Sequence, residues 1–511
     1  SRFPEQRIQD YDTTSYRLLA GLRGELADWS YESALSYGKT DNEITHVSGY
    51  IGIDKLDTAI ANGSFNPFNL GRDNSEAVLA SVRELAPRRG ESTVVAADFN
   101  IAGDLGIELS AGAINAVFGA EVRREEISDS PSAVAQADGI YGLGASDAKA
   151  DRSQYALYSE FNLPLTDNLD VIAALRYDHY SDFGGDINPK LSLRYRATDD
   201  LILRASWSTG FRAPSLSQLG AGTSLTANYI DCGSGQPFDA LCGDFGAQFG
   251  ELEFDQETLG NTALDAESSE AVNLGASWNL TENLQVTLDY WRYEHTDIVD
   301  VDANTTLRAC ISGSAPLVNT EAELGNRFGC VIDSGNDLTF LRTGFFNVGS
   351  QETDGVDIKL NYRLDTDNAG RFDFYANATK TLSYERQITP DSEKQDLLGK
   401  LSGAAEIARP EFVADFGADW SLQNWSASMS AHYISSLGDG DFKFDNDTVD
   451  SWLLLSSSLG YDISDNQSVL LSVRNLTDKK PPYASSPTNG YASSVHDWIG
   501  RLWTLRYTVS F

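Results

Sequence analysis

The sequence predicts an all-β fold, an antiparallel transmembrane β-barrel with long loops at one end. Its repeated unit is a pair of alternating apolar and polar segments joined by a very short polar turn, as in residues 153–165 and 168–180. Because side chains on a strand point alternately to its two faces, each segment has one apolar face. Similar turns recur at residues 197–201, 280–284 and 463–467, and long irregular stretches separate the pairs. Short turns at one end and long loops at the other are typical of barrels in the bacterial outer membrane.

The composition favours strands over helices as the membrane-crossing elements. No apolar run approaches the roughly 18 residues that a transmembrane helix needs, and the richest runs, residues 93–97 and 171–175, are strand-sized. Aromatic residues make up 11% of the 511 residues, although the mean hydropathy is −0.31. A barrel reconciles the two values because only alternate residues face lipid and the loops are polar. With no linker-like run in the chain, residues 1–511 are expected to form one partial barrel.

Seventeen strands are expected along the chain, and most are roughly 9–16 residues long, enough to cross a bilayer about 30 Å thick at a tilt. Their ranges are 15–26, 28–39, 93–105, 109–124, 153–165, 168–180, 188–197, 200–210, 269–280, 283–296, 345–364, 371–385, 410–422, 424–435, 452–463, 466–476 and 498–511. We interpret residues 43–54 as part of a loop followed by a short helix near residues 56–61. A further strand at residues 43–54 is the alternative.

Alternation assigns individual side chains to the lipid or to the lumen. In the strand at 200–210 the side chains expected to face lipid are Leu201, Leu203, Ala205, Trp207 and Thr209. Those expected to face the lumen are Ile202, Arg204, Ser206 and Ser208. The last strand is expected to present to lipid Trp503, Leu505, Tyr507, Val509 and Phe511. Trp and Tyr residues gather near strand ends, as interfacial girdles do; ordinary core aromatics of a soluble β protein are the alternative.

The odd strand count has a structural consequence. Single-chain bacterial barrels have an even number of strands, and an unpaired strand edge is not tolerated in lipid. If every short turn is periplasmic, the first strand descends from an external segment, residues 1–14, and the last strand ends in the periplasm. We therefore expect N-terminal strands to be missing from this chain. The start Ser1-Arg2-Phe3, without an initiator Met or a signal peptide, leads us to expect a processed or truncated product.

The strongly acidic character of the chain argues against nucleic acid as a partner. The net charge is −37, and such a protein repels phosphates. Much of the acid lies in expected loops, and one cluster consists of Asp439, Asp441, Asp445, Asp447 and Asp450. The first interpretation of this cluster is a solvated loop. A divalent-cation site is the second, although the ordered spacing of a calcium loop is missing.

The four cysteines fall into two pairs, each within one long loop. Cys232 and Cys242 form the first pair, and Cys310 and Cys330 form the second. No zinc-type C-x-x-C spacing occurs. We predict two local disulfides in an oxidising compartment; four free thiols are the alternative.

Catalytic motifs are missing from the sequence, so an enzyme, a cofactor and a catalytic metal are not predicted. There is no H-E-x-x-H, G-x-S-x-G, P-loop or dinucleotide fingerprint. Candidate ligand contacts combine a lumen-facing position with closeness to the outer rim, and they are Arg176, Asp178, Tyr180, Arg212, Trp291, Tyr293 and His295. The alternative for each is ordinary packing of the lumen wall, with Arg176 and Asp178 in a charge ladder.

Four groups of short motifs follow one another between residues 188 and 511. The first comprises N-P-K at 188–190 and G-F-R-A-P at 210–214, and the second is L-D-A-E-S-S at 264–269 before N-L-G at 273–275. The third is Phe346-Asn347 with D-G-V-D at 354–357. The last is N-L-T-D-K-K-P at 475–481, followed by Gly500-Arg501 and the terminal Phe511. In this order and spacing they resemble the barrel of TonB-dependent outer-membrane receptors.

The resemblance implies a fold, a location and a function. That family's barrel has 22 strands around an N-terminal plug with a TonB box, so this chain would lack the plug and about five strands. Membership implies the outer membrane of a Gram-negative bacterium, with lipid and lipopolysaccharide as neighbours. It also implies active uptake of a scarce nutrient, such as a metal chelate, a cobalamin-like compound or an oligosaccharide, with energy from the TonB complex through the absent plug.

Two other functions remain as alternatives. One is a passive porin-like channel, which needs no partner. The other is a surface-binding protein or adhesin, whose disulfide-bearing loops at 211–268 and 297–343 would grip a protein or polymer.

Overall fold

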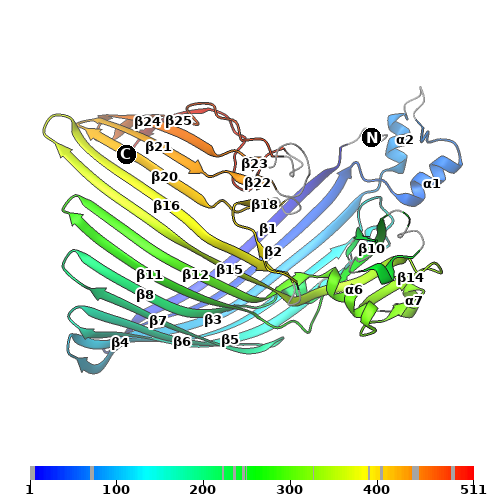
Figure 1. The fold of residues 1–511 in the computed structure, drawn as a ribbon, viewed down its shortest axis with the longest axis horizontal. Helices are drawn as coiled ribbons and strands as arrows, with labels where there is room; N and C mark the ends of the chain where they lie inside the picture. Colours follow the sequence, from blue (N-terminus) through cyan, green and yellow to red (C-terminus); the bar gives the residue numbers. More distant parts are fainter. Residues whose placement is uncertain are drawn as a thin grey trace.

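A single curved antiparallel sheet dominates the computed structural model of the chain (Figure 1). The structure describes residues 6–68, 74–144, 146–220, 222, 224–233, 238–243, 248, 250–325, 327–388, 392–402, 407–439, 448–484 and 490–510. Twenty-two strands are linked in the sheet, of which β9, β10, β13, β14 and β17 are short strands of loops. The remaining 17, called the wall strands, follow one another in chain order.

The wall strands match the seventeen expected ones. Their bounds are β1 Ile8–Leu26, β2 Trp29–Ser48, β3 Ala86–Leu109, β4 Gly112–Pro131, β5 Ala148–Thr166, β6 Leu169–Tyr180, β7 Gly184–Arg196, β8 Leu201–Arg212, β11 Glu267–Thr281, β12 Leu284–Val301, β15 Leu338–Thr366, β16 Gly370–Gln387, β20 Phe412–Leu422, β21 Trp425–Ile434, β24 Trp452–Ser464, β25 Gln467–Arg474 and β26 Leu502–Val509. All neighbours pair antiparallel, from β1 with β2 to β25 with β26. Within the described residues, no pairing joins β1 to β26.

Several wall strands are longer than expected, because they continue beyond the apolar segment. β1 begins at Ile8, inside the segment that we expected to be an external loop, and β2 continues to Ser48. Residues 43–48 are therefore the end of β2 and neither a loop nor an additional strand, whereas the predicted short helix exists as α1 (Ile53–Ala61). Backbone hydrogen bonds hold these extensions together. They therefore form without an alternating apolar pattern, and the sequence does not predict them.

The assignment of side chains to two faces agrees with the contacts of β8. On β8, Leu203 and Trp207 are exposed, whereas on β26 side chains of both faces are exposed. The opposite face of β8 carries Arg204, whose guanidinium lies 2.7 Å from the Asp289 carboxylate of β12. The ion pair spans β11 at Gly275, where a Cβ atom would lie 2.1 Å from Asp289. Phe511 lies outside the described residues.

The two ends of the sheet differ as the sequence predicted. Short turns join the wall strands at the left end of Figure 1, and the helices and long loops gather at the right end. The predicted turns appear as Asp167-Asn168, Glu282-Asn283 and Asp465-Asn466, each between two paired strands, and as residues 197–200. None of the helices in the described part of the chain is long and apolar enough to span a membrane.

The long loops carry the remaining helices and strands. These are α2 Glu76–Val82, α3 Ala133–Gln136, α4 Leu216–Gly220, β9 Ser224–Asp231, the 3-10 helix η1 Asp239–Leu241, β10 Glu251–Leu259, α6 Ala303–Ser312, β13 Leu317–Val318, α7 Glu321–Leu324, β14 Gly329–Ile332, β17 Gln395–Asp396, β18 Lys400–Ser402, β19 Ile407–Ala408, β22 Leu437–Asp439 and β23 Thr448–Val449. The clusters of buried apolar residues described for this chain lie almost entirely in these loops and at their junctions with the wall strands. This distribution fits a barrel whose lumen is polar.

Two loops fold together into one unit, which we call the disulfide module. It comprises β9, η1, β10, α6, β13, α7, β14 and the adjoining end of β15. Both predicted disulfides are present, Cys232–Cys242 with Cα atoms 5.9 Å apart and Cys310–Cys330 with Cα atoms 6.1 Å apart. Cysteines of both bridges share one apolar core with Leu241, Phe254 and Leu307 among others. Each bridge is local, but the core joins two loops that are separate in sequence.

Three further loops form a second unit, the C-terminal loop module. Its four-stranded sheet runs in the order β19-β18-β22-β23. Residues of the loop after β25 pack on this sheet, so that Ala484 and Ala492 share a core with Leu401, Leu437 and Val449.

Candidate functional site

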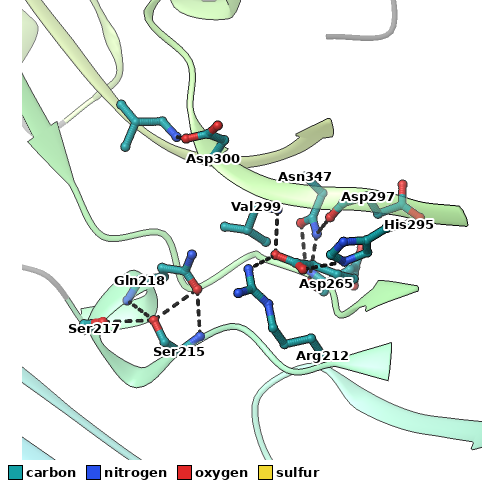
Figure 2. A network of polar contacts seen from close by, with 12 residues as sticks. Arg212, Ser215, Ser217, Gln218, Asp265, His295, Asp297, Val299, Asp300 and Asn347 are labelled. Atoms are coloured by element: carbon teal, nitrogen blue, oxygen red, sulfur yellow. Dashed lines mark hydrogen bonds and ion pairs between the residues drawn. The ribbon is translucent and has the colours of Figure 1, made fainter. Parts of the chain in front are cut away.

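A buried carboxylate lies where the disulfide module meets the wall strands. Glu267, the first residue of β11, is 1% exposed. It pairs with the guanidinium of Arg212 at the end of β8, and its Oε1 atom accepts a hydrogen bond of 2.9 Å from the Val299 backbone N–H. The Nε2 atom of His295 lies 2.7 Å from Oε2. Figure 2 shows Arg212 and His295 reaching this point from different strands.

An asparagine clamps the same junction from β15. The Asn347 amide donates to the backbone oxygens of Asp265 and Asp297, at 2.9 Å each, and accepts a hydrogen bond from the Asp265 backbone N–H at 3.0 Å (Figure 2). Beneath it, Leu216, Leu219, Leu264 and Val299 form a small apolar core. Polar contacts and core together fix the exit of β8, the entry of β11 and the end of β12 relative to one another.

A second polar cluster lies on β4, β5 and β6. The Arg176 guanidinium lies 2.8 Å from Asp178 and 2.8 Å from Glu121, and it covers the ring of Tyr158 at 5.4 Å. Asp178 is 3% exposed. Arg176 is thus held on three sides by the wall itself, which is the charge-ladder arrangement that the sequence offered as the alternative to ligand contact.

Aromatic rings gather at the outer end of β6. Tyr180 stacks on Phe183 at 4.8 Å and meets Phe211 edge-on at 5.7 Å, and the Arg152 guanidinium lies 5.2 Å from the Tyr180 ring centre. Arg152 also donates to the backbone oxygen of Pro214 at 2.7 Å. Phe211 and Pro214 flank Arg212, so this aromatic cluster adjoins the Glu267 junction.

Trp291 and Tyr293 lie on β12 on the same face as His295. Their ring centres are 5.7 Å apart, and Tyr293 is 51% exposed. The Trp291 ring covers Gly355 of β15, where a Cβ atom would lie 2.4 Å from the ring. The glycine in D-G-V-D therefore leaves the space that Trp291 occupies, and Tyr293 remains free to present its ring to the outer mouth.

The predicted contact residues divide into groups. Arg212 and His295 converge on Glu267, Trp291 and Tyr293 follow along β12, and Tyr180 lies in the adjoining aromatic cluster. Arg176 and Asp178 form the separate wall cluster. Glu267 itself was not predicted as a site residue, although it stands in the L-D-A-E motif. The signal was present in that motif, but only the pairing of β8 with β11 brings Glu267 opposite Arg212.

The chain matches a known family along most of its length. A family model described as TonB dependent receptor-like, beta-barrel, matches residues 1–476. The chain belongs to this family of TonB-dependent receptors. A probable TonB-dependent siderophore receptor, PirA of Acinetobacter baumannii, is 27% identical over 186 residues, which cover 35% of this chain and 22% of that protein. The ferrienterobactin receptor of Escherichia coli is 31% identical over 134 residues, which cover 25% of this chain and 17% of that receptor.

Solved structures of TonB-dependent receptors share the fold. The siderophore receptor PirA of Acinetobacter baumannii superposes with a TM-score of 0.63 at 17% identity, covering 98% of this chain and 63% of that one. A ferric enterobactin receptor of Pseudomonas aeruginosa gives a TM-score of 0.62 at 17% identity, covering 98% and 62%. The chain thus spans less than two thirds of these receptors. Family and fold together indicate the outer membrane of Gram-negative bacteria, and these relatives are receptors, not enzymes.

The N-L-T-D-K-K-P motif of this TonB-dependent receptor has a structural role. Asn475 and Asp478 both adopt left-handed backbone conformations, with φ of 54° each. The Asn475 side chain accepts from the Lys479 backbone N–H at 2.8 Å, and Asp478 accepts from the Arg501 backbone N–H at 2.8 Å. The motif therefore ties the loop after β25 to the residues that begin β26.

A buried histidine lies in the same loop. His496 is 4% exposed and meets the Trp452 ring edge-on at 5.0 Å. Neither ring nitrogen of His496 has a hydrogen-bond partner among the described residues. Burial lowers the pKa of His496 to about 4, so this side chain is neutral at physiological pH.

Only two of the five aspartates in the acidic cluster at residues 439–450 lie within the described residues. Asp439 is buried at the end of β22 and Asp450 is exposed, whereas Asp441, Asp445 and Asp447 lie outside the described residues. Across the described residues, no three His, Cys, Asp or Glu side chains are grouped to hold a metal ion.

Proposed function

We propose that the protein is an outer-membrane receptor that captures a ferric siderophore outside the cell and imports it with energy from the TonB complex. This chain belongs to the family of TonB-dependent receptors, and its relatives include a probable TonB-dependent siderophore receptor and a ferrienterobactin receptor. The observation that carries the proposal is the group of aromatic and charged side chains at the outer mouth. Tyr293 offers an exposed ring, Arg212 supplies a cation, and Tyr180 belongs to the adjoining aromatic cluster. These groups suit an anionic aromatic chelate.

The acidic character of the chain does not oppose this ligand at short range. The net charge is −37, but charges farther than about 8 Å apart are largely screened at physiological salt. Arg212 lies at the mouth with its side chain 61% exposed. A ligand that reaches the mouth would contact the Arg212 guanidinium before it contacts side chains deeper on the wall strands.

We further propose that the sheet is completed by strands that pair with β1 and β26, and that a plug within the barrel contacts TonB. The support is physical. A strand edge left unpaired in hydrocarbon leaves a row of backbone donors and acceptors unsatisfied, and β1 and β26 pair with one described neighbour each. In the same proposal, lipid and lipopolysaccharide surround the exposed apolar face.

The test is uptake of radioactive ferric siderophore by cells that express the complete gene. We expect saturable uptake that stops when the proton gradient is collapsed. Arg212→Gln should weaken binding about tenfold, which corresponds to ~1.4 kcal/mol. Arg363→Gln is the matched control, because it removes an arginine that pairs with Asp373 near the opposite, short-turn end of the barrel.

The alternatives give different results in the same assay. Uptake that persists after the gradient is collapsed would support the porin-like channel and refute active transport. Binding that depends on the disulfide module, combined with no uptake of any chelate, would support the adhesin. Deleting the loop around Cys232–Cys242 should abolish capture without preventing insertion of the barrel.

A further inference from the structure

An apolar groove crosses the lipid-facing side of β2 to β6. The strand registers place five side chains in one row, Leu35, Ala97, Val122, Tyr155 and His179. Leu35, Val122 and Tyr155 are 61%, 55% and 44% exposed. Ala97 is the smallest of the row, so the larger side chains beside it, with Val95, form the walls of the groove.

One end of the groove is a flat aromatic surface. The rings of Tyr155 and His179 stack at 4.9 Å with an angle of 7° between their planes. Such a paired surface offers a wide apolar face with polar atoms at its edge, which suits the boundary between hydrocarbon and headgroups.

Charged side chains lie directly beyond the groove on the same face. Arg124 stands opposite Val95 in the register and is 62% exposed. It lies 3.0 Å from Asp151, which is 51% exposed. An ion pair this exposed contributes only about 0–1 kcal/mol, so another anion can replace the carboxylate at the guanidinium.

Two other cations and their acidic partners lie in the same charged belt. Lys39 lies 3.0 Å from Glu91 and 3.2 Å from Asp41, and Lys149 lies 4.0 Å from Glu126. Carboxylates slightly outnumber cations in this belt. An anion is therefore expected to bind at Arg124, which has the most accessible guanidinium next to the groove, and not along the belt as a whole.

The height of the groove places it in the outer leaflet. Val122 lies ten residues beyond the start of β4 at Gly112. At ~3.4 Å per residue and a tilt of about 45°, it lies roughly 24 Å above the short turns, near the top of an apolar band about 25 Å tall. The change from apolar to charged rows occurs at the same height.

We propose that this groove is a specific binding site for a multi-acyl, phosphorylated glycolipid of the outer leaflet. The acyl chains lie along the groove, and a phosphate takes the place of Asp151 on Arg124. The row spans five strands and is therefore about 19 Å wide. This width gives room for several acyl chains side by side, more than one glycerophospholipid has. The site rests on the part of the proposed function that surrounds the apolar face with lipid and lipopolysaccharide, and it does not depend on which nutrient the receptor imports.

The test measures the lipid that stays on the purified full-length protein. Native mass spectrometry in a mild detergent should find bisphosphorylated lipid A on the wild type. Ala97→Trp fills the floor of the groove with an apolar side chain and should reduce this occupancy at least tenfold. Ala276→Trp is the matched control, because Ala276 lies opposite the lipid-facing Leu203 and outside the groove; its occupancy should equal that of the wild type.

Heat-modifiable mobility on a gel shows whether Ala97→Trp folds. A second variant tests the site if Ala97→Trp does not fold. Arg124→Gln should reduce retention of bisphosphorylated lipid A at least fivefold and leave retention of dephosphorylated lipid A unchanged. Equal occupancy in wild type and Ala97→Trp, or equal retention of both lipids by wild type and Arg124→Gln, would overturn the site. Displacement of lipid A by phosphatidylglycerol at the same concentration would overturn its assignment to a glycolipid.

Discussion

At the scale of single residues, buried polar groups organise the outer mouth. Glu267 is almost fully buried, yet Arg212, His295 and a backbone N–H surround it. A buried carboxylate is tolerated only when charge and hydrogen bonds compensate for lost hydration. The ends of β8 and β12 supply these partners and Glu267 begins β11, so the carboxylate joins three strand ends.

We predict that Glu267→Gln loosens this junction. The amide keeps the shape but loses the charge that faces Arg212 and His295, and the loss should be about 1–2 kcal/mol because Arg212 is partly exposed. Limited proteolysis of the loop at residues 213–266 should become faster. Glu270→Gln, at an exposed position of the same strand, should change nothing; equal effects of both variants would contradict the role of Glu267.

The buried His496 should make the stability of the loop after β25 depend on pH. The unfolded loop takes up a proton near pH 6.5, whereas the folded loop takes it up only near pH 4, since burial lowers the pKa. The loop is therefore fully stable above pH 6.5 and loses about 3 kcal/mol as the pH falls to 4. His496→Phe keeps a ring against Trp452 and should remove this part of the pH dependence, measured by proteolysis of residues 475–501. An unchanged pH profile would contradict it.

At the scale of elements, the disulfide module gives rigidity to segments that would otherwise be long loops. Its two bridges close segments of 10 and 20 residues, and its core includes buried side chains from both loops. The sequence predicted the pairing of the cysteines but not the shared core. The core depends on β10 lying parallel to β15, a contact between segments about 85 residues apart.

We predict unequal effects from removing the two bridges. The entropy that a bridge removes from the unfolded chain grows with loop length, so the pair Cys310→Ala and Cys330→Ala should destabilise the module more than Cys232→Ala and Cys242→Ala, by about 0.6 kcal/mol. Hydrogen exchange of α6 and β14 measures the difference. The wall strands should keep their protection in both variants, and a larger loss from the shorter bridge would contradict the expected order.

At the scale of the whole molecule, the alternation of side chains separates a lipid-facing surface from a polar lumen. Neighbouring positions on one strand therefore tolerate charge very differently. On β8, Ala205 is assigned to lipid, and Ser206 lies opposite Asn273 on the lumen side.

The consequence is a paired test on β8. Ala205→Lys should destabilise the barrel by about 2–4 kcal/mol, because the ammonium would lie near the middle of the bilayer. Ser206→Lys should have little effect, since its side chain enters the polar lumen. Urea unfolding in lipid vesicles, followed by tryptophan fluorescence, compares the two; similar losses would contradict the assignment of faces.

The sequence alone determined the number of wall strands, their faces, the short turns and the cysteine pairs. It could do so because each of these features is local: alternation repeats every two residues, and a turn or a disulfide loop is short. Strand extensions such as residues 43–48 escaped prediction, because backbone pairing beyond the bilayer requires no apolar pattern. Only the tertiary structure placed Glu267 between Arg212 and His295, fused two loops into one module and aligned Ala97 with Val122 and Tyr155. These arrangements depend on strand register and on contacts between distant segments, which local composition does not encode.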